Sequence, residues 1–389
     1  MSATTAPRPD TVMGRALAAR VLDLEALQDR TRLQPSDDLM DLMHSVPQPL
    51  PEHVRQAAKD ALDRGETHYT TRPGVVELRR AIAEHATAAG FPAVVDRTVV
   101  TNGAAEALFI ALQAALSPGA RAAVVEPMAP HVIQMIRFVG AEVVPITPVA
   151  DADFLVAPAA VAATQADVLV LASPSPVSGK ALPPPALEAI LGTALDRGMY
   201  VILDRTSAPC LFDPTLARID DADLGSRVIT VGSFSSGYDL GGWRVGYFTA
   251  PTEQVAKLRG LKQAMSICTT AVSQYAALAA LTGPDDWRAA RRAEFAARLD
   301  AAVTVLREAG LPVIPPDAYP GLLVDTRRVD PDDAVVAERL RASGVVVDPC
   351  WRYGRATAGF IRIDLGAERR DLVTGIERIA QLGQGGRHG

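Results

Sequence analysis

The sequence predicts an α/β fold in which a mainly parallel, seven-stranded sheet is covered by helices on both faces, beside a smaller α+β domain. Between residues 98 and 250, short β-branched runs alternate with Ala- and Leu-rich stretches, a pattern typical of a parallel sheet. The runs are almost continuously apolar, as strands buried on both faces are. After about residue 283 the alternation stops, which indicates a second unit.

Seven runs are expected to form the large sheet. They cover 98–101, 122–125, 143–146, 168–172, 200–203, 228–231 and 245–248. Helical stretches separate most of them, including 104–116, 129–139 and 187–197. The last run follows a glycine-rich turn without an intervening helix, so this strand is expected to be antiparallel.

The C-terminal part is expected to combine helices with short strands. Apolar residues recur at helical spacing from 287 to 306, and again from 372 to 379. Short strands are expected at 322–324, 345–347 and 360–363. We therefore predict three parts, which are an N-terminal arm over 1–35 with a helix at 16–30, a small α+β domain formed by 36–60 and 284–389, and a large α/β domain over 61–283.

Composition argues against several classes of protein. The chain has 389 residues, of which 48% are hydrophobic and 22% charged, and a net charge of −6. Without a basic tract, neither nucleic acid nor a membrane is an expected partner. No apolar run approaches the ~20 residues of a membrane span, and no signal peptide is expected. Three widely spaced cysteines favour a cytoplasmic location and suggest no metal site.

Seven segments stand in one order and spacing along the chain. They are Tyr69–His85, Thr101–Leu112, Glu126–His131, Ser173–Lys180, Leu203–Ser207, Ser233–Tyr247 and Phe360–Gly366. Together they resemble the class I/II aminotransferases, which are pyridoxal-phosphate (PLP) enzymes of fold type I, over about residues 38 to 383. The resemblance implies PLP as cofactor, a small carboxylate or amino-acid-like substrate, and a homodimer.

The resemblance assigns the cofactor phosphate to a cup of hydrogen-bond donors. Backbone amides at a strand-to-helix turn would contribute first, because a helix N-terminus attracts anions. Two serine hydroxyls and one arginine complete the cup. The matching residues are Gly103, Ala104, Ala105, Ser233, Ser235 and Arg244. A surface ion pair is the alternative for Arg244.

Three more positions match functional residues of the family. Asp204 matches the carboxylate that pairs with the pyridine nitrogen and makes the ring an electron sink. A helix cap or an ion pair with Arg205 is the alternative for Asp204. Arg362 matches the arginine that binds the substrate's α-carboxylate, and Tyr69 a tyrosine that crosses the dimer interface to the partner's phosphate site.

Four positions depart from the family pattern. The family's SxSK motif supplies a lysine that forms an internal aldimine with PLP, whereas this chain has Ser236 there. Ala129, Pro176 and Ser207 replace the aromatic ring, asparagine and tyrosine that contact the cofactor ring. The chain's lysines lie elsewhere, at Lys59, Lys180, Lys257 and Lys262. Lys180 is expected to be structural or exposed, and none is an evident substitute.

These departures predict that the chain is not a conventional transaminase, since losing one general base costs about 10²–10⁴-fold in rate. One hypothesis is an enzyme of specialised small-molecule biosynthesis. It would bind PLP, its amine form PMP or a PLP–amino acid adduct noncovalently, with His131 or Tyr69 moving protons. A second is a cofactor-free enzyme that uses the anion cup, Asp204 and Arg362 for cyclisation, condensation or elimination. A third is a non-catalytic binding or scaffold subunit.

Overall fold

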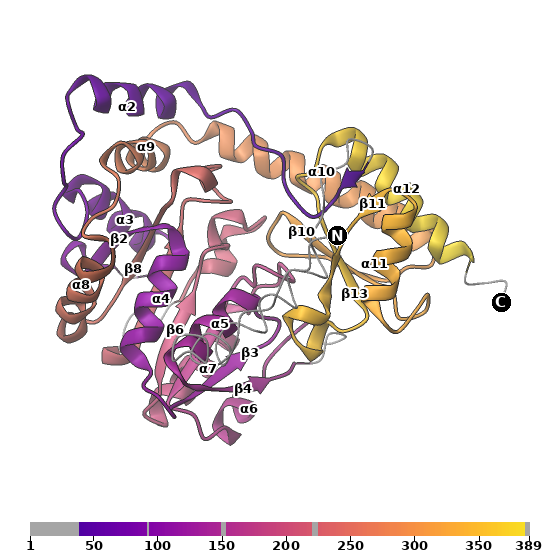
Figure 1. Cartoon of the computed structure of the whole chain (residues 1–389), viewed down its shortest axis with the longest axis horizontal. Coiled ribbons are helices and arrows are strands. Elements are labelled where there is room, and N and C mark those ends of the chain that lie inside the picture. The colour runs from indigo at the N-terminus through magenta and orange to yellow at the C-terminus, as the bar shows by residue number, and fades with distance from the viewer. Residues whose placement is uncertain (1–38, 92, 149–152, 220–224, 386–389) are drawn as a thin grey trace, which may run out of the picture.

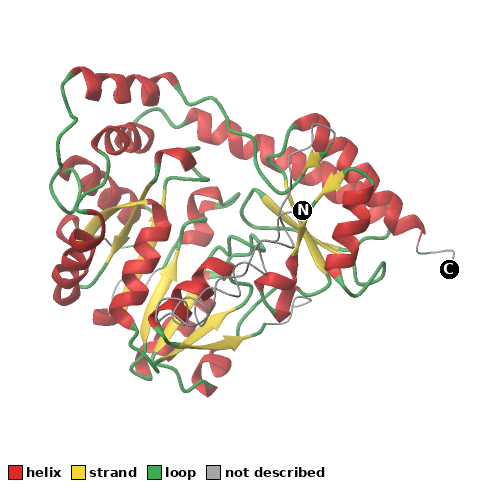
Figure 2. Ribbon diagram, in the orientation of Figure 1, coloured by secondary structure: helices red, strands yellow, loops and turns green. Residues whose placement is uncertain are grey.

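A computed structural model describes residues 39–91, 93–148, 153–219 and 225–385 (Figure 1). The arm predicted over 1–35, with its helix at 16–30, lies outside the described residues. Two bodies are visible, one built on a large sheet and one on smaller sheets, with helices around both (Figure 2). None of the helices in the described part combines the length and apolar composition that a bilayer crossing requires.

A seven-stranded sheet forms the core of the larger body. Its strand order is β2 (Thr98–Asn102), β8 (Val245–Thr249), β7 (Val228–Ser233), β6 (Tyr200–Asp204), β5 (Val168–Ala172), β3 (Arg121–Val125) and β4 (Glu142–Ile146). Strand β8 is antiparallel to both neighbours, and the other pairs are parallel. The mainly parallel sheet and its antiparallel strand are therefore confirmed.

Helices cover both faces of this sheet because successive strand residues point to opposite sides. Ile202 packs in a core with α4 (Gly103–Ala115), α5 (Pro130–Val139) and α8 (Thr252–Ser266). Leu203, the next residue, packs on the opposite face with α6 (Pro158–Ala163) and α7 (Pro184–Asp196). Near β2 and β8, that face is covered by α3 (Val76–Ala88) and α9 (Ala271–Thr282), and α2 (Glu52–Asp63) packs on α9.

The C-terminal part contains two small sheets. One is a parallel pair of β1 (Met40–Asp41) and β11 (Val345–Val346), which joins the start of the described chain to its C-terminal part. The other is antiparallel, in the order β12 (Asp348–Pro349), β13 (Phe360–Asp364), β10 (Gly321–Asp325) and β9 (Val313–Ile314). The helices here are α10 (Asp286–Glu308), α11 (Asp333–Ala342) and α12 (Arg369–Gly385). The predicted domain boundaries at 61 and 284 stay a prediction.

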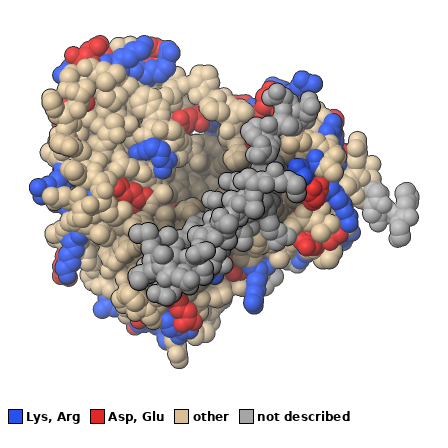
Figure 3. All heavy atoms as spheres, in the orientation of Figure 1, with Lys and Arg blue, Asp and Glu red and all other residues tan. Residues whose placement is uncertain are grey.

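Short 3-10 helices occupy several connections. They are η1 (Val95–Arg97), η3 (Ala208–Cys210), η4 (Pro214–Ala217), η5 (Gly225–Arg227), η6 (Gly241–Trp243), η7 (Cys350–Tyr353) and η8 (Arg355–Thr357). On the face seen in Figure 3, basic and acidic side chains are interspersed, and the surface is hollowed between the two bodies. This hollow is where the loops from the carboxyl ends of the parallel strands face the smaller body (Figure 1).

Candidate functional site

The turn between β2 and α4 is covered by an arginine from a distant segment. Helix α4 begins at Gly103, which has a φ of +78°, and a Cβ built there would lie 2.2 Å from Nη2 of Arg244. The Arg244 guanidinium therefore packs directly on the N-terminus of α4. Its Nη1 donates to the carbonyl of Gly241 at 2.9 Å. A cation against the positive end of a helix dipole is unfavourable unless an anion neutralises both.

The serines of the predicted cup reach this turn through the sheet register. Ser233 is the last residue of β7 and pairs with Gly246 of β8. A Cβ on Gly246 would lie 2.5 Å from the backbone nitrogen of Ala104, so β8 packs tightly on the turn. Ser233 is buried, and its Oγ accepts from the Ser235 amide at 3.0 Å. Arg244, Gly103 and Ala104 are thus brought together next to the end of β7, where Ser233 lies.

Asp204 lies at the carboxyl end of β6 and is 5% exposed. Its Oδ1 accepts from the backbone N–H of Thr206 at 2.8 Å, a local turn contact. Burial raises the pKa of Asp204, and the nearby His131 ring opposes that rise. Packing around the ring lowers the pKa of His131, while the Asp204 carboxylate opposes that fall. A buried carboxyl of this kind can stabilise a cation placed beside it.

Between the two bodies lies a cavity of about 450 Å³. We call it the central cavity. Ser235, Ser236, Ser207 and Pro176 line it on the side of the large sheet, and Arg362 lines it on the other. Ser236 therefore faces the same space as Arg362, the predicted carboxylate-binding arginine. The segment 43–48 completes one wall.

Arg362 lines this cavity and has one unsatisfied donor. Its side chain extends from β13 across Gly321 of β10, where a Cβ would lie 2.6 Å from Nε. The side chain is 13% exposed, and its Nη2 lies 3.9 Å from Asp364. Among the described residues, its buried Nε has no hydrogen-bond partner. A carboxylate would satisfy such a guanidinium fork.

The other predicted residues do not all meet at this cavity. Ala129 lies at the start of α5 and packs against the core around α4. Tyr69 is 81% exposed and does not line the central cavity. His131 interacts electrostatically with Asp204 but does not line the central cavity.

The four lysines are all in the described part of the chain, and none lines the central cavity. Lys180 forms an ion pair with Asp317 at 3.1 Å. Lys59 and Lys257 are exposed on α2 and α8. Lys262 is 1% exposed and lies 3.8 Å from Glu106.

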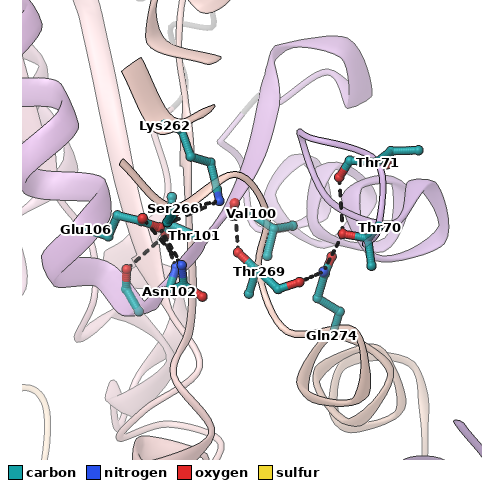
Figure 4. Close-up of polar contacts among 11 residues, drawn as sticks. Thr70, Thr71, Val100, Thr101, Asn102, Glu106, Lys262, Ser266, Thr269 and Gln274 are labelled. Carbon is teal, nitrogen blue, oxygen red and sulfur yellow. Dashed lines mark hydrogen bonds and ion pairs between the residues drawn. The ribbon is translucent and has the colours of Figure 1, made fainter. Parts of the chain in front are cut away.

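A buried polar network behind the cup was missed by the sequence analysis. Glu106 accepts from the backbone N–H of Asn102 at 2.6 Å, and Lys262 also donates to Ser266 at 3.2 Å. Figure 4 shows these side chains pointing toward one another at the first turn of α4. A glutamate near a helix start is a recognisable capping signal. Nothing in the polar sequence of α8 marks Lys262 as buried.

The Gln274 side chain anchors the segment that follows Tyr69, as Figure 4 shows. Nε2 of Gln274 donates to Thr70 at 3.2 Å and to the carbonyl of Thr269 at 2.8 Å. Its Oε1 accepts from the Val75 backbone at 2.8 Å. This side chain is fully buried, so it anchors the exposed segment to the large body.

Comparisons with known proteins agree with this geometry. Residues 38–379 match the family model described as aminotransferase class I and II. The aspartate/prephenate aminotransferase of Thermus thermophilus is 29% identical over 342 residues, which cover 85% of this chain and 87% of that protein. An arginine–pyruvate transaminase of Pseudomonas aeruginosa is 31% identical over 339 residues, covering 85% and 86%. The solved aspartate aminotransferase of Thermus thermophilus with maleate has a TM-score of 0.82 at 28% identity, covering 94% of this chain and 96% of that one.

These relatives contradict the functional prediction made from the sequence. The prediction that the chain is not a conventional transaminase is wrong, because its relatives over 85% of its length are aminotransferases. The error came from weighing four substituted contacts, at Ser236, Ala129, Pro176 and Ser207, above the charged groups. Charged contacts contribute more to binding than neutral ones, and the chain has charged residues at Arg244, Asp204 and Arg362. The chain belongs to the class I and II aminotransferase family.

Proposed function

We propose that this chain is a PLP-dependent aminotransferase that moves an amino group between an α-amino acid and a 2-oxo acid while holding its cofactor by noncovalent contacts alone. One observation carries the proposal. The central cavity brings Ser235 of the predicted cup and the Arg362 guanidinium to one space, and no lysine of the chain lines it. When bound, PLP supplies an electron-withdrawing ring that stabilises negative charge on the amino acid's α-carbon.

The cup residues fit the cofactor phosphate. Gly103 provides room for the Arg244 fork, and the amides of Ala104 and Ala105 stand at the positive end of α4. The hydroxyls of Ser233 and Ser235 add two neutral donors. A dianionic phosphate would neutralise the guanidinium and the helix end together. This is the contact that must replace a covalent attachment.

Asp204 fits the pyridine nitrogen. Without a cation, burial favours its neutral form. The Asp204 carboxylate would stabilise a protonated ring nitrogen and would itself be favoured in its charged form. In this role it would keep the bound ring electron-withdrawing.

Arg362 fits the substrate's α-carboxylate, because its Nε and terminal nitrogens form a fork with two parallel donors. The smaller body supplies this arginine, whereas the larger one supplies the cup. A substrate bound by both would lie across the central cavity with its α-carbon near Ser236. Ser236 can hydrogen-bond there, although it is no amine.

His131 is proposed as the proton-moving group. Its lowered pKa keeps the ring neutral near pH 7, so it can accept a proton. Tyr69 is proposed to act across a homodimer interface, which is supported by its exposure of 81% on a segment anchored by Gln274. A stable dimer of this kind would bury more than ~2,000 Å² in total.

The experiment is a transamination assay of purified protein with added PLP, using aspartate, arginine and aromatic amino acids as donors and 2-oxoglutarate or pyruvate as acceptors. Arg362→Gln should raise KM for the amino acid by about ten- to a hundredfold, the loss expected for a charge-assisted contact. Arg341→Gln on exposed α11 is the matched control and should change nothing. Absence of amino transfer from every donor would contradict the proposal.

A further inference from the structure

A second cavity lies on the face of the large sheet that α3 and α9 cover. Its volume is about 410 Å³, and no residue lines both it and the central cavity. Its walls come from the C-terminal half of α3, from η3, from β7 and β8, and from the first turns of α10. We call it the rear cavity. Small-molecule sites have volumes of about 300–1,000 Å³, so it is large enough for a ligand.

Arg205 lies in the wall of the rear cavity. It directly follows Asp204, so strand alternation directs the two side chains to opposite faces of the sheet. Its guanidinium stacks on the ring of Phe91 at 4.0 Å, and Nη2 donates to the carbonyl of Ala217 at 2.6 Å. Nη1 is buried and has no hydrogen-bond partner among the described residues.

No carboxylate in the described part of the chain forms an ion pair with Arg205, and burial lowers its pKa to about 10. The Tyr247 phenol works against that fall. Buried charges in proteins are normally paired, because an unpaired one is costly to remove from water. The ion pair with Arg205, given above as an alternative for Asp204, does not form. An anion placed in the cavity would provide the missing partner.

The outer part of the rear cavity is also cationic. Arg288 is 7% exposed, lies over the Tyr238 ring at 4.4 Å and pairs with Asp285 at 3.0 Å. Its Nε and that of Arg292 are buried without a hydrogen-bond partner among the described residues. His85 and Asp285 are exposed and line the cavity, so they mark its mouth. Three guanidinium groups thus line the cavity with one carboxylate among them.

Aromatic side chains form another part of the wall. Phe234 contacts Tyr238 and Tyr247, with ring centroids 5.0 Å and 6.1 Å away. The Tyr247 ring crosses Gly232 of the neighbouring strand, where a Cβ would lie 2.1 Å from its Cζ. Burial raises the pKa of both tyrosines, so their hydroxyls stay neutral donors.

We propose that the rear cavity is a second binding site, for a small aromatic carboxylate whose carboxylate pairs with Arg205 and whose ring packs against Phe234, Tyr238 and Tyr247. The unpaired guanidinium at one side selects an anion. The aromatic walls select a flat, apolar body. This ligand is separate from the amino acid at Arg362, because the two arginines open into different cavities.

The test uses phenylacetate and the full-length Arg362→Gln protein, in which the carboxylate site of the central cavity is removed. Calorimetry should detect one phenylacetate site. Arg205→Met in the same background should weaken it by about ten- to a hundredfold, and Arg341→Met should leave it unchanged. Benzyl alcohol, which has the ring without the carboxylate, should not bind. Equal affinity in the Arg205→Met protein, or no binding at all, would overturn the proposal.

A second measurement needs no substitution at Arg205. Hydrogen exchange of the Arg362→Gln protein should slow with phenylacetate in segments 85–91 and 281–292, which line the rear cavity. Segment 43–48, which lines the central cavity, should be unaffected. Slowing in 43–48 alone would assign phenylacetate to the central cavity and would refute the rear site.

Discussion

Gly103→Ala tests the cup at its tightest point. A Cβ there would lie 2.2 Å from Nη2 and 2.7 Å from Cζ of Arg244, and the φ of +78° is one that alanine rarely adopts. The backbone strain should cost about 1–2 kcal/mol of folding free energy. The methyl group must also push the guanidinium off the turn. Losing its contact with a phosphate should cost a further ~1.5–3 kcal/mol of binding free energy, which is about ten- to a hundredfold in the Kd for PLP.

Gly119→Ala is the matched control, because Gly119 has a φ of +82° but nothing within 4 Å of its Cβ. Both variants should lose similar stability in urea unfolding, and only Gly103→Ala should lose PLP affinity in a fluorescence titration. Pyridoxal, which lacks the phosphate, should bind both variants as it binds the unchanged protein. If Gly103→Ala binds PLP with unchanged affinity, Arg244 and this turn do not hold the phosphate.

The remaining predictions concern Asp204, Ser236 and Lys262. Burial raises the pKa of Asp204 above its ordinary value of 3.8. Between these two pKa values the folded protein binds more protons than the unfolded chain, so its stability should fall as pH rises through this range. Asp204→Asn should remove this fall in stability, measured as Tm against pH, and should lower kcat by about 10²-fold or more. An unchanged kcat would count against a contact between Asp204 and the cofactor's pyridine nitrogen. Treatment with PLP and borohydride should attach a pyridoxyl group to the introduced lysine of Ser236→Lys but not to that of the control Ser343→Lys. Equal labelling of the two introduced lysines would place residue 236 away from the cofactor. Lys262→Ala should cost about 3–5 kcal/mol in urea unfolding because the largely buried Glu106 carboxylate loses its ion-pair partner. Lys59→Ala should cost less than ~0.5 kcal/mol.

Strand periodicity was sufficient to predict the large sheet. Runs such as 168–172 are apolar on both faces, and only a sheet with helices on both sides buries such runs. The antiparallel strand β8 was predictable because a glycine-rich turn leaves no room for a crossover helix. The pairing of β1 with β11 joins residues more than 300 positions apart. Such short strands carry too few residues to show a pattern of their own.

The candidate site residues came from the family resemblance. It assigned Arg244 to the cofactor phosphate and Asp204 to the pyridine nitrogen, and these roles stay predictions; the structure places Arg244 against the N-terminus of α4 and buries Asp204 at the end of β6. The network around Lys262 was not predictable, because a lysine on a polar helix is usually solvated. The rear cavity was not predictable either, since Arg205 was interpreted only as a possible partner for Asp204.

The most direct test of the proposed function measures amino transfer and cofactor attachment in one sample. Protein that is turning over an amino acid and a 2-oxo acid with PLP is treated with borohydride, denatured and weighed by mass spectrometry. The account predicts amino transfer from protein whose mass is unchanged, because no lysine lines the central cavity. Stoichiometric pyridoxyl labelling of Lys180, Lys257 or Lys262 that rises and falls with activity would contradict it.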